Sequence, residues 1–195
     1  MAKSGQNNRP DIQLLWEQMK NGKNQALATL FKHYYPLLYD YGKKISHQDE
    51  LVKDSIQELF AYIWNKRKSL SRVESVTSYL MVAMRRQLFK AIKQQRKNKE
   101  IYQEFSSTQP QQAFSAEDML VMNETIASER KSVKRALNKI PTRMREALYL
   151  KTYSGLSYKE IALIMQINPQ VARNYVSEAF RRLRSIITEK SKIYE

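Results

Sequence analysis

Hydrophobic residues recur at spacings of three and four along most of the chain, and polar residues fill the positions between them. This period is typical of amphipathic helices that bury one face. The pattern predicts helices over residues 12–20, 24–45, 49–67, 78–99, 117–139 and 142–153, and a closing pair of helices within 156–184. Only 4 glycines and 5 prolines occur in the 195 residues, which agrees with an all-α fold.

Local signals mark several helix boundaries. Asp11 stands at an N-cap position, and Ser46 with Asp49 gives a second start that is similar to a capping box. Pro36 lies inside the second predicted helix. Because proline lacks an N–H and clashes with the preceding turn, we expect it to break or kink that helix near Tyr35.

The closing stretch, residues 156–184, has the pattern of a helix-turn-helix. Ser157 and Glu160 form a capping box, and Asn168 followed by Pro169 is a favourable start for the second helix. The outer face of that second helix carries Gln170, Arg173, Asn174, Ser177, Arg181, Arg182 and Arg184. Such a helix can lie in the major groove, with its first residues on base edges and its arginines on phosphates.

Charge favours a polyanionic partner. The chain has 34 basic and 19 acidic residues, a net charge of +15, of which +8 lies in residues 51–100 and +4 in 151–195. The long helix 78–99 carries Arg85, Arg86, Lys90, Lys93, Arg96, Lys97 and Lys99 and no acid. Like charges at this density repel one another, so a bound anion explains them better than solvent alone.

Two simpler interpretations stay open at this point. The closing pair can be an ordinary helical hairpin with a charged, solvated face, although Glu178 is the one acid among Arg173, Arg181, Arg182 and Arg184. A membrane surface is also a polyanion. It is less favoured, because no continuous apolar insertion face accompanies the basic segments.

Composition excludes several classes of function. The absence of cysteine rules out disulfides and thiol chemistry and fits a reducing compartment, and 2 histidines make a zinc site unexpected. No apolar run approaches the ~20 residues of a membrane span, and the polar N-terminus lacks a signal-peptide core. No catalytic constellation is evident. We therefore expect a cytoplasmic protein that is not an enzyme, with no cofactor, no metal and no direct membrane insertion.

Residues 100–117 change character. Gln, Ser and Thr dominate, Pro110 interrupts, and the helical period is lost. We interpret this stretch as a linker between two helical domains, 11–99 and 118–190, and residues 1–10 as a disordered N-terminus.

Three motifs in this order resemble a known family. Asp54-x-x-Gln57-Glu58-x-Phe60-x-x-x-Trp64 is similar to the region 2.2 signature of the extracytoplasmic-function (ECF) group of bacterial sigma-70 factors. Tyr79-Leu80 stands where that family commonly has Trp-Leu ahead of a basic helix. The third motif resembles region 4 and comprises Leu137, Ile140-Pro141, Tyr149-Leu150, Leu156-Ser157-Tyr158, Glu160-Ile161-Ala162 and Ala179 with Leu183-Arg184. The resemblance covers residues 25–183.

The chain departs from the family at positions that face DNA. Arg86 stands where the family often has Asn, and Lys90 where it often has Asp. The recognition helix opens with Val171-Ala172-Arg173, where a Thr-Val-Lys run is usual. These changes bear on which promoter sequence is read, because base-facing positions differ. DNA binding is still expected, since each change keeps or adds positive charge or stays neutral.

The resemblance implies roles for particular residues. It implies that 11–99 is region 2 and 118–190 is region 4, and that core RNA polymerase binds Asp54, Gln57 and Glu58. The −10 element would contact Lys66, Arg67, Tyr79, Arg85, Arg86, Lys90 and Lys93, with the loop 66–76 capturing a base and Tyr79 either stacking a base or belonging to the core. The −35 element would contact Ser157, Lys159, Gln170, Val171, Arg173, Asn174, Ser177, Arg181 and Arg182. Many relatives are also held inactive by an anti-sigma factor.

Two other functions compete with this interpretation. A stand-alone helix-turn-helix regulator would bind its duplex tightly without polymerase, often as a dimer on paired half-sites. A basic helical RNA-binding or scaffold protein would show no promoter preference.

Overall fold

The computed structural model describes residues 11–102 and 136–191, with side chains given within 11–95 and 136–186, and these parts are all-helical. The elements are α1 (Ile12–Lys20), α2 (Asn24–Ile45), α3 (Asp49–Lys66), the 3-10 turn η1 (Arg67–Ser69), α4 (Val76–Tyr102), α6 (Thr142–Thr152), α7 (Tyr158–Met165) and α8 (Pro169–Ser191). The predicted all-α fold is confirmed, with the two helix groups at the predicted places along the chain.

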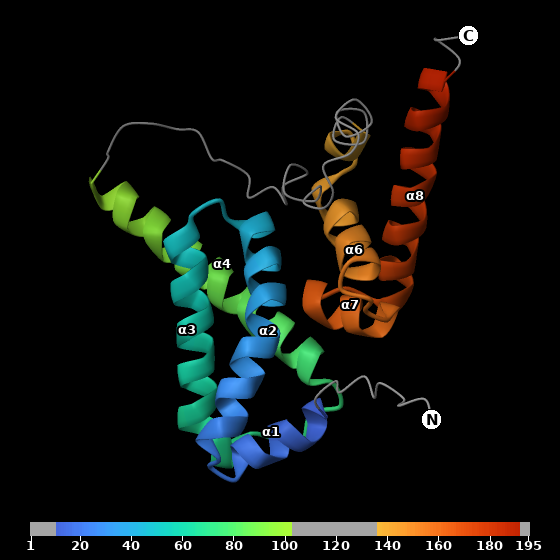
Figure 1. Ribbon diagram of the computed structural model, residues 1–195. Helices are drawn as coiled ribbons and strands as arrows, with labels where there is room; N and C mark the ends of the chain where they lie inside the picture. Colours follow the sequence, from blue (N-terminus) through green and yellow to red (C-terminus); the bar gives the residue numbers. More distant parts are fainter. Residues whose placement is uncertain (1–10, 103–135, 192–195) are drawn as a thin grey trace, which may run out of the picture.

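The first group forms a helical domain. Helices α2 and α3 run side by side, α4 crosses them, and α1 lies across one end (Figure 1). Its fully buried side chains come from all four helices and include Trp16, Met19, Leu30, Leu38, Tyr41, Ile56, Ile63, Leu80, Met84 and Leu88. The hydrophobic stripes of the sequence therefore meet at one centre.

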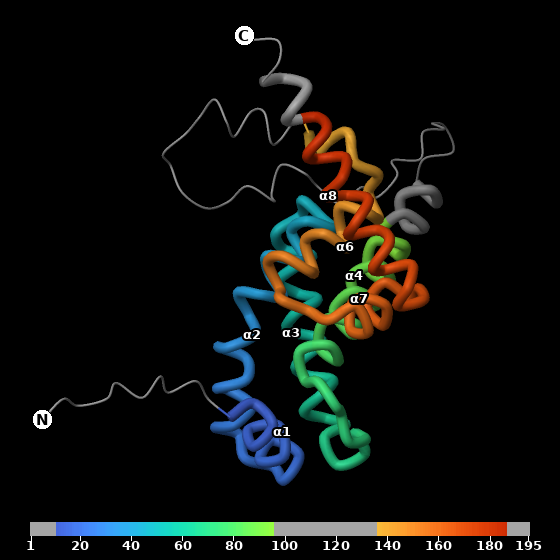
Figure 2. The backbone as a smooth tube through the Cα atoms, turned by 90° about the vertical axis from the view of Figure 1, so that its right-hand side faces the viewer, coloured from blue at the N-terminus to red at the C-terminus, as the bar shows by residue number. Residues whose placement is uncertain are grey.

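The second group packs α6 against α8 and sets α7 across them, with Ile161, Ile164, Ala172, Val176 and Ala179 buried between the helices. Both views place α7 beside α4 (Figures 1 and 2). The buried residues of the two groups form one continuous cluster. The two domains are therefore in direct contact in this structure.

Helix α2 continues through Pro36, so the predicted break near Tyr35 is wrong. Pro36 is exposed, while Leu30 and Tyr34 before it and Leu38 and Tyr41 after it are buried. Burial of the same stripe on both sides holds the helix together, although the proline removes one backbone hydrogen bond.

Some predicted boundaries hold and others move. Asp11 caps α1, since its side chain accepts a hydrogen bond from the Leu14 N–H. The capping-box start at Ser46 is wrong: Ser46 ends α2, and α3 begins after Gln48 without a side-chain cap. Residues 100–102, assigned to the linker, continue α4. The rest of the linker (103–117), residues 1–10 and most of the predicted helix 117–139 lie outside the described residues.

Within the described residues, no helix is both long and apolar enough to cross a membrane.

Gly42 allows α2 to approach two neighbours closely. A Cβ placed there would lie 2.6 Å from Val52 Cγ1 and 2.9 Å from Met84 Cε. We expect Gly42→Ala to lower the free energy of unfolding by roughly 1–3 kcal/mol through overpacking, despite the better helix propensity of alanine. Urea unfolding measures the change. The cost of Gly42→Ala should shrink in a Val52→Ala background, and an equal cost in both backgrounds would contradict the proposed clash.

Candidate nucleic-acid interface

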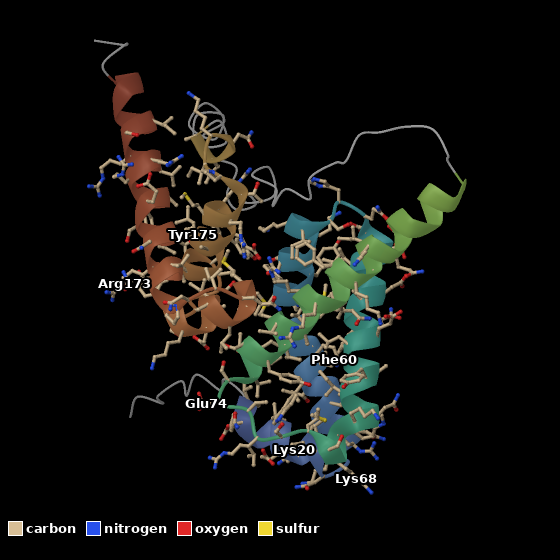
Figure 3. The ribbon with its side chains drawn as sticks, turned by 180° about the vertical axis from the view of Figure 1, so that it is seen from behind. Lys20, Phe60, Lys68, Glu74, Arg173 and Tyr175 are labelled. Atoms are coloured by element: carbon tan, nitrogen blue, oxygen red, sulfur yellow. The ribbon has the colours of Figure 1, made fainter. Side chains whose placement is uncertain are left out.

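Helix α8 presents a polar face to solvent at its N-terminal end. Asn168 Oδ1 accepts a hydrogen bond from the Gln170 N–H at 2.8 Å, so this residue caps the helix as the sequence predicted. The exposed side chains are Gln170, Arg173, Asn174, Ser177 and Arg181, whereas Val171 and Arg182 are partly buried. Figure 3 shows Arg173 on the outer side of α8 and Tyr175 toward α6. This face is free to meet a duplex groove.

Two arginines of this helix already hold a carboxylate. Glu178 accepts two hydrogen bonds from Arg181 and one from Arg182, each at 2.7 Å. Hydrogen bonds from Arg181 and Arg182 lower the pKa of Glu178 to about 2, so it is ionised at neutral pH. A phosphate that takes the donor groups now bonded to Glu178 would have to displace this carboxylate.

Helix α7 begins with the predicted capping box. Ser157 Oγ accepts a hydrogen bond from the Glu160 N–H at 3.3 Å, and the Ser157 N–H donates to Glu160 Oε2 at 2.8 Å. Ser157 and Lys159 are exposed at this helix start. The Tyr158 ring lies beneath Arg173, with 5.4 Å between the ring centroid and the guanidinium carbon. The start of α7 and the N-terminal part of α8 are thereby tied together.

Helix α4 carries an exposed basic stripe formed by Arg86, Lys90 and Lys93. Their spacing of four and three residues places them on one face. Arg85 lies beside this stripe but turns toward the second domain, where its Nε is bonded to Glu146 of α6. Its guanidinium carbon also lies 4.5 Å from the ring centroid of Phe89, one turn further along α4. Of the four cations predicted on this helix to contact the −10 element, three are exposed together and one is not.

Glu146 of α6 is the partner of Arg85, and the contact joins the two domains. Arg85 donates to the Glu146 carboxylate from Nε at 2.9 Å and from Nη2 at 3.3 Å. The Tyr41 hydroxyl donates to Glu146 Oε1 at 2.7 Å. Burial lowers the pKa of Arg85, but the bonds and charge of Glu146 outweigh that effect and raise it overall. Burial and the negative charge of Glu146 raise the pKa of Tyr41, so its hydroxyl stays protonated.

A second polar contact between the domains meets at Glu160. Ser75 and Ser78, at the start of α4, each donate a hydroxyl hydrogen bond to Glu160 Oε1 at 2.8 Å. Burial alone would raise the pKa of Glu160, but hydrogen bonds from the Ser157 backbone and from Ser78, Ser157 and Ser75 lower it to about 2. The N-termini of α4 and α7 both face this carboxylate. The positive ends of the two helix dipoles stabilise its negative charge.

The segment after α3 holds the other predicted −10 residues. Lys66 is exposed. Arg67 stacks on Trp64 with 4.2 Å from its guanidinium carbon to the ring centroid, and its Nη1 donates to the Trp64 carbonyl at 2.8 Å. Tyr79 is half-buried and contacts Trp16 edge-on, with 5.4 Å between ring centroids. Tyr79 thus packs against the core, as one of its two predicted roles required.

Helix α3 turns Asp54, Gln57 and Glu58 to solvent, opposite the buried Ile56, Leu59 and Ile63. Glu58 also accepts a hydrogen bond from Gln87 of α4. The outward placement predicted from the helical period is therefore present in the structure.

Three residues at the contact between the domains were not singled out from the sequence. Glu146 was one polar residue within a predicted helix. Ser75 lay in a predicted loop, and in the structure it directly precedes α4. Tyr41 lay within the predicted helix 24–45 and had no predicted polar partner. A charged residue on the buried side of a helix is a usable signal for Glu146, because such a group requires a partner.

Comparison with known proteins identifies both domains. The family model of Sigma-70 region 2 matches residues 30–98, and that of Sigma-70, region 4 matches residues 130–183. The chain is 18% identical over 178 residues to the ECF RNA polymerase sigma factor SigK of Mycobacterium ulcerans (strain Agy99), covering 91% of this chain and 94% of that protein.

Two solved structures share the fold. CnrH, in complex with the cytosolic domain of CnrY, is similar with a TM-score of 0.60 and 16% identity, covering 91% of this chain and 97% of that one. The sigma factor RpoE, in complex with the anti-sigma factor NepR from Bartonella quintana, has a TM-score of 0.58 and 19% identity, covering 83% and 96%. The two matched regions and the ECF relative establish that the chain belongs to the sigma-70 family of RNA polymerase sigma factors, in its ECF group.

Proposed function

We propose that this sigma factor docks on core RNA polymerase through the exposed face of α3 formed by Asp54, Gln57 and Glu58. The carrying observation is that these three polar side chains share one solvent-facing stripe while the opposite stripe of the helix is buried. A rigid helix with a polar outer face offers a partner a surface that needs no rearrangement before binding.

Residues 11–99 would act as region 2 and hold the −10 element as a single strand. The exposed Arg86, Lys90 and Lys93 supply cations for its phosphates, and Lys66 and Arg67 lie at the start of the loop that would receive a base. Strand opening needs no bond-making step, because binding the separated strand lowers the free energy of the open state. On this proposal the chain acts by binding and is not an enzyme.

Residues 118–190 would act as region 4 and read the −35 element as a duplex. Gln170, Arg173 and Asn174 occupy the exposed first turns of α8, the part of a recognition helix that reaches base edges. Lys159 and Arg181 flank them and suit phosphates.

Binding both elements requires the domains to separate. The −10 and −35 positions lie ~25 base pairs apart, which is about 85 Å along B-DNA at 3.4 Å per step. In this structure α4 and α7 are close enough for a 2.8 Å hydrogen bond between Ser78 and Glu160. We infer that the described arrangement is a closed form that opens on core polymerase.

The partners and the compartment follow from this role. Core polymerase and promoter DNA place the protein in the cytoplasm. Two structures that share its fold are complexes, one with the cytosolic domain of CnrY and one with the anti-sigma factor NepR. An anti-sigma factor that favours the closed form would keep the chain inactive.

Transcription with purified core polymerase on a genomic promoter library tests the assignment. New start sites preceded by two spaced elements are expected only when the chain is added. Tight, sequence-specific duplex binding by the chain alone, without added transcription, would instead support the stand-alone regulator.

Replacing Asp54 and Gln57 together by alanine should weaken binding to core polymerase without lowering the melting temperature, because both side chains are exposed. Binding is measured by fluorescence anisotropy of labelled chain titrated with core enzyme. The matched control is Asp40→Ala with Gln25→Ala, which removes the same two side-chain types from exposed positions of α2. Equal core affinity in the two double variants would contradict the docking face.

Arg173→Ala should weaken binding of holoenzyme to a −35 duplex by roughly 1–3 kcal/mol if Arg173 contacts a base edge, and the loss should depend on sequence. Arg173→Lys keeps the charge but loses two-pronged hydrogen bonding, so it should rescue little. Competition binding against scrambled duplex separates the cases. A loss that is equal on all duplexes and restored by lysine would assign Arg173 to a phosphate.

Glu146→Ala should open the free chain, because it leaves Arg85 and Tyr41 buried without their acceptor. The chain has no cysteine, so dyes on Gln25→Cys and Ser185→Cys report the distance between the domains by energy transfer. We expect lower transfer efficiency in Glu146→Ala. Glu178→Ala, which removes a carboxylate bonded within α8, is the control and should leave the efficiency unchanged. Unchanged transfer in both variants would count against the closed form.

A further inference from the structure

A basic hollow lies at the end of the first domain, where α1 meets η1. It has a volume of about 410 Å³ and is lined by Lys20, Asn21, Gly22, Arg67 and Lys68. Lys20 and Lys68 are at the same end of the domain (Figure 3). Three of these five residues are cations, and the described lining includes no acidic side chain. An anion is the ligand that such a lining favours.

Arg67 supplies a second, independent sign of a missing ligand. Stacking on Trp64 and the bond from Nη1 to the Trp64 carbonyl fix the guanidinium in place. Its Nε is buried and has no hydrogen-bond partner among the described residues. A Cβ placed on Gly22 would have Arg67 Nε as its neighbour at 3.9 Å, so this N–H lies beside the turn that lines the hollow. A buried donor without an acceptor is costly, and an anion oxygen would satisfy it.

The lysines are free to turn to such a ligand. Lys20 pairs with Glu17 of α1 at 3.4 Å, and the Lys20 and Glu17 side chains are 20% and 46% exposed. A single ion pair between partly exposed side chains contributes little and exchanges easily. Lys68 is exposed at the rim. Both side chains can therefore reach a bound anion without breaking a strong ion pair.

Capping of α1 does not account for the cations. The turn at Gly22, which has a φ of +86°, already closes the helix end. Backbone N–H groups of Asn21, Gly22 and Lys23 donate to the carbonyls of Glu17, Met19 and Gln18. These backbone bonds satisfy three carbonyls of the last turn of α1. They also occupy the N–H groups of the turn, so side chains would bind the anion.

The hollow adjoins the segment to which we assign the captured −10 base. Arg67 and Lys68 begin that segment, and Gln13 of α1 donates to the Val73 carbonyl within it at 3.1 Å. Helix α1 therefore supports the same loop from behind. A strand that places a base in the loop would bring a neighbouring backbone phosphate toward the hollow.

We propose that the hollow between α1 and η1 binds one backbone phosphate of the single-stranded −10 element, held by Lys20, Arg67 and Lys68. The proposal rests on the proposed function, because region 2 must hold that strand. It extends the DNA contact to α1, a helix for which the sequence predicted no DNA contact.

Holoenzyme binding to a bubble template with a pre-opened −10 element tests this site. Lys20→Ala with Lys68→Ala should weaken binding about five- to twentyfold near 0.1 M salt. The slope of log affinity against log salt should fall by about 0.7 for each phosphate that the variant no longer neutralises. The control is Lys32→Ala with Lys139→Ala, which removes two exposed lysines outside the hollow and should leave affinity for the bubble unchanged.

Methylphosphonate substitution of the non-template strand, one phosphate at a time, locates the contact. Wild-type holoenzyme should lose affinity at a phosphate that the Lys20→Ala, Lys68→Ala variant no longer senses. The same sensitivity profile in both proteins would overturn the site while leaving the sigma function intact. Failure of wild-type holoenzyme to bind the bubble at all would overturn the proposed function, and this site with it.

Discussion

The proposed closed form centres on the Glu146 carboxylate, which is buried between the domains and held by Arg85 and Tyr41. A buried charge is tolerated only with partners. The side chains of Glu146, Arg85 and Tyr41 therefore either stay in contact or all become hydrated when the contact opens. Such a contact contributes modest net stability, because opening returns hydration to both ions. It gives a defined closed geometry that a partner can open. Release of Glu146 would also free Arg85, a cation beside the exposed stripe of α4.

Glu160 combines a local and a long-range role. Its bonds to Ser157 begin α7 and require no other part of the chain, whereas its bonds to Ser75 and Ser78 join residues 85 and 82 positions apart. If the domains part, the capping box remains and the helix-turn-helix keeps its start. The carboxylate therefore allows separation without unfolding of the DNA-binding unit. A buried apolar contact at the same place would leave a hydrophobic patch exposed after opening.

The sequence predicted features that neighbouring residues determine. The capping box at Ser157, the cap at Asn168 and the outward face at Asp54 each follow from residues within a few turns. Pro36 and Ser46 were misjudged because burial of a whole helix face outweighed one local rule. Arg85 was predicted as exposed with its neighbours, because its partner Glu146 is 61 residues away and belongs to another domain. The hollow beside Gly22 likewise needs a turn and a loop to meet, which no helical period reports.

Internal carboxylates divide the positive charge into two classes. Arg86, Lys90, Lys93 and Arg173 are exposed and, on the proposed function, would provide the long-range attraction that steers the chain to DNA. Arg85, Arg181 and Arg182 hold Glu146 or Glu178 in the free chain. For these arginines DNA binding would replace one oxyanion with another. The Arg85 side chain is only 17% exposed, so its dehydration is largely complete beforehand, whereas Arg181 is 74% exposed and would still lose water on binding. On this reasoning the exposed cations would govern the rate of encounter with DNA, and Arg85 would act after the domains have opened.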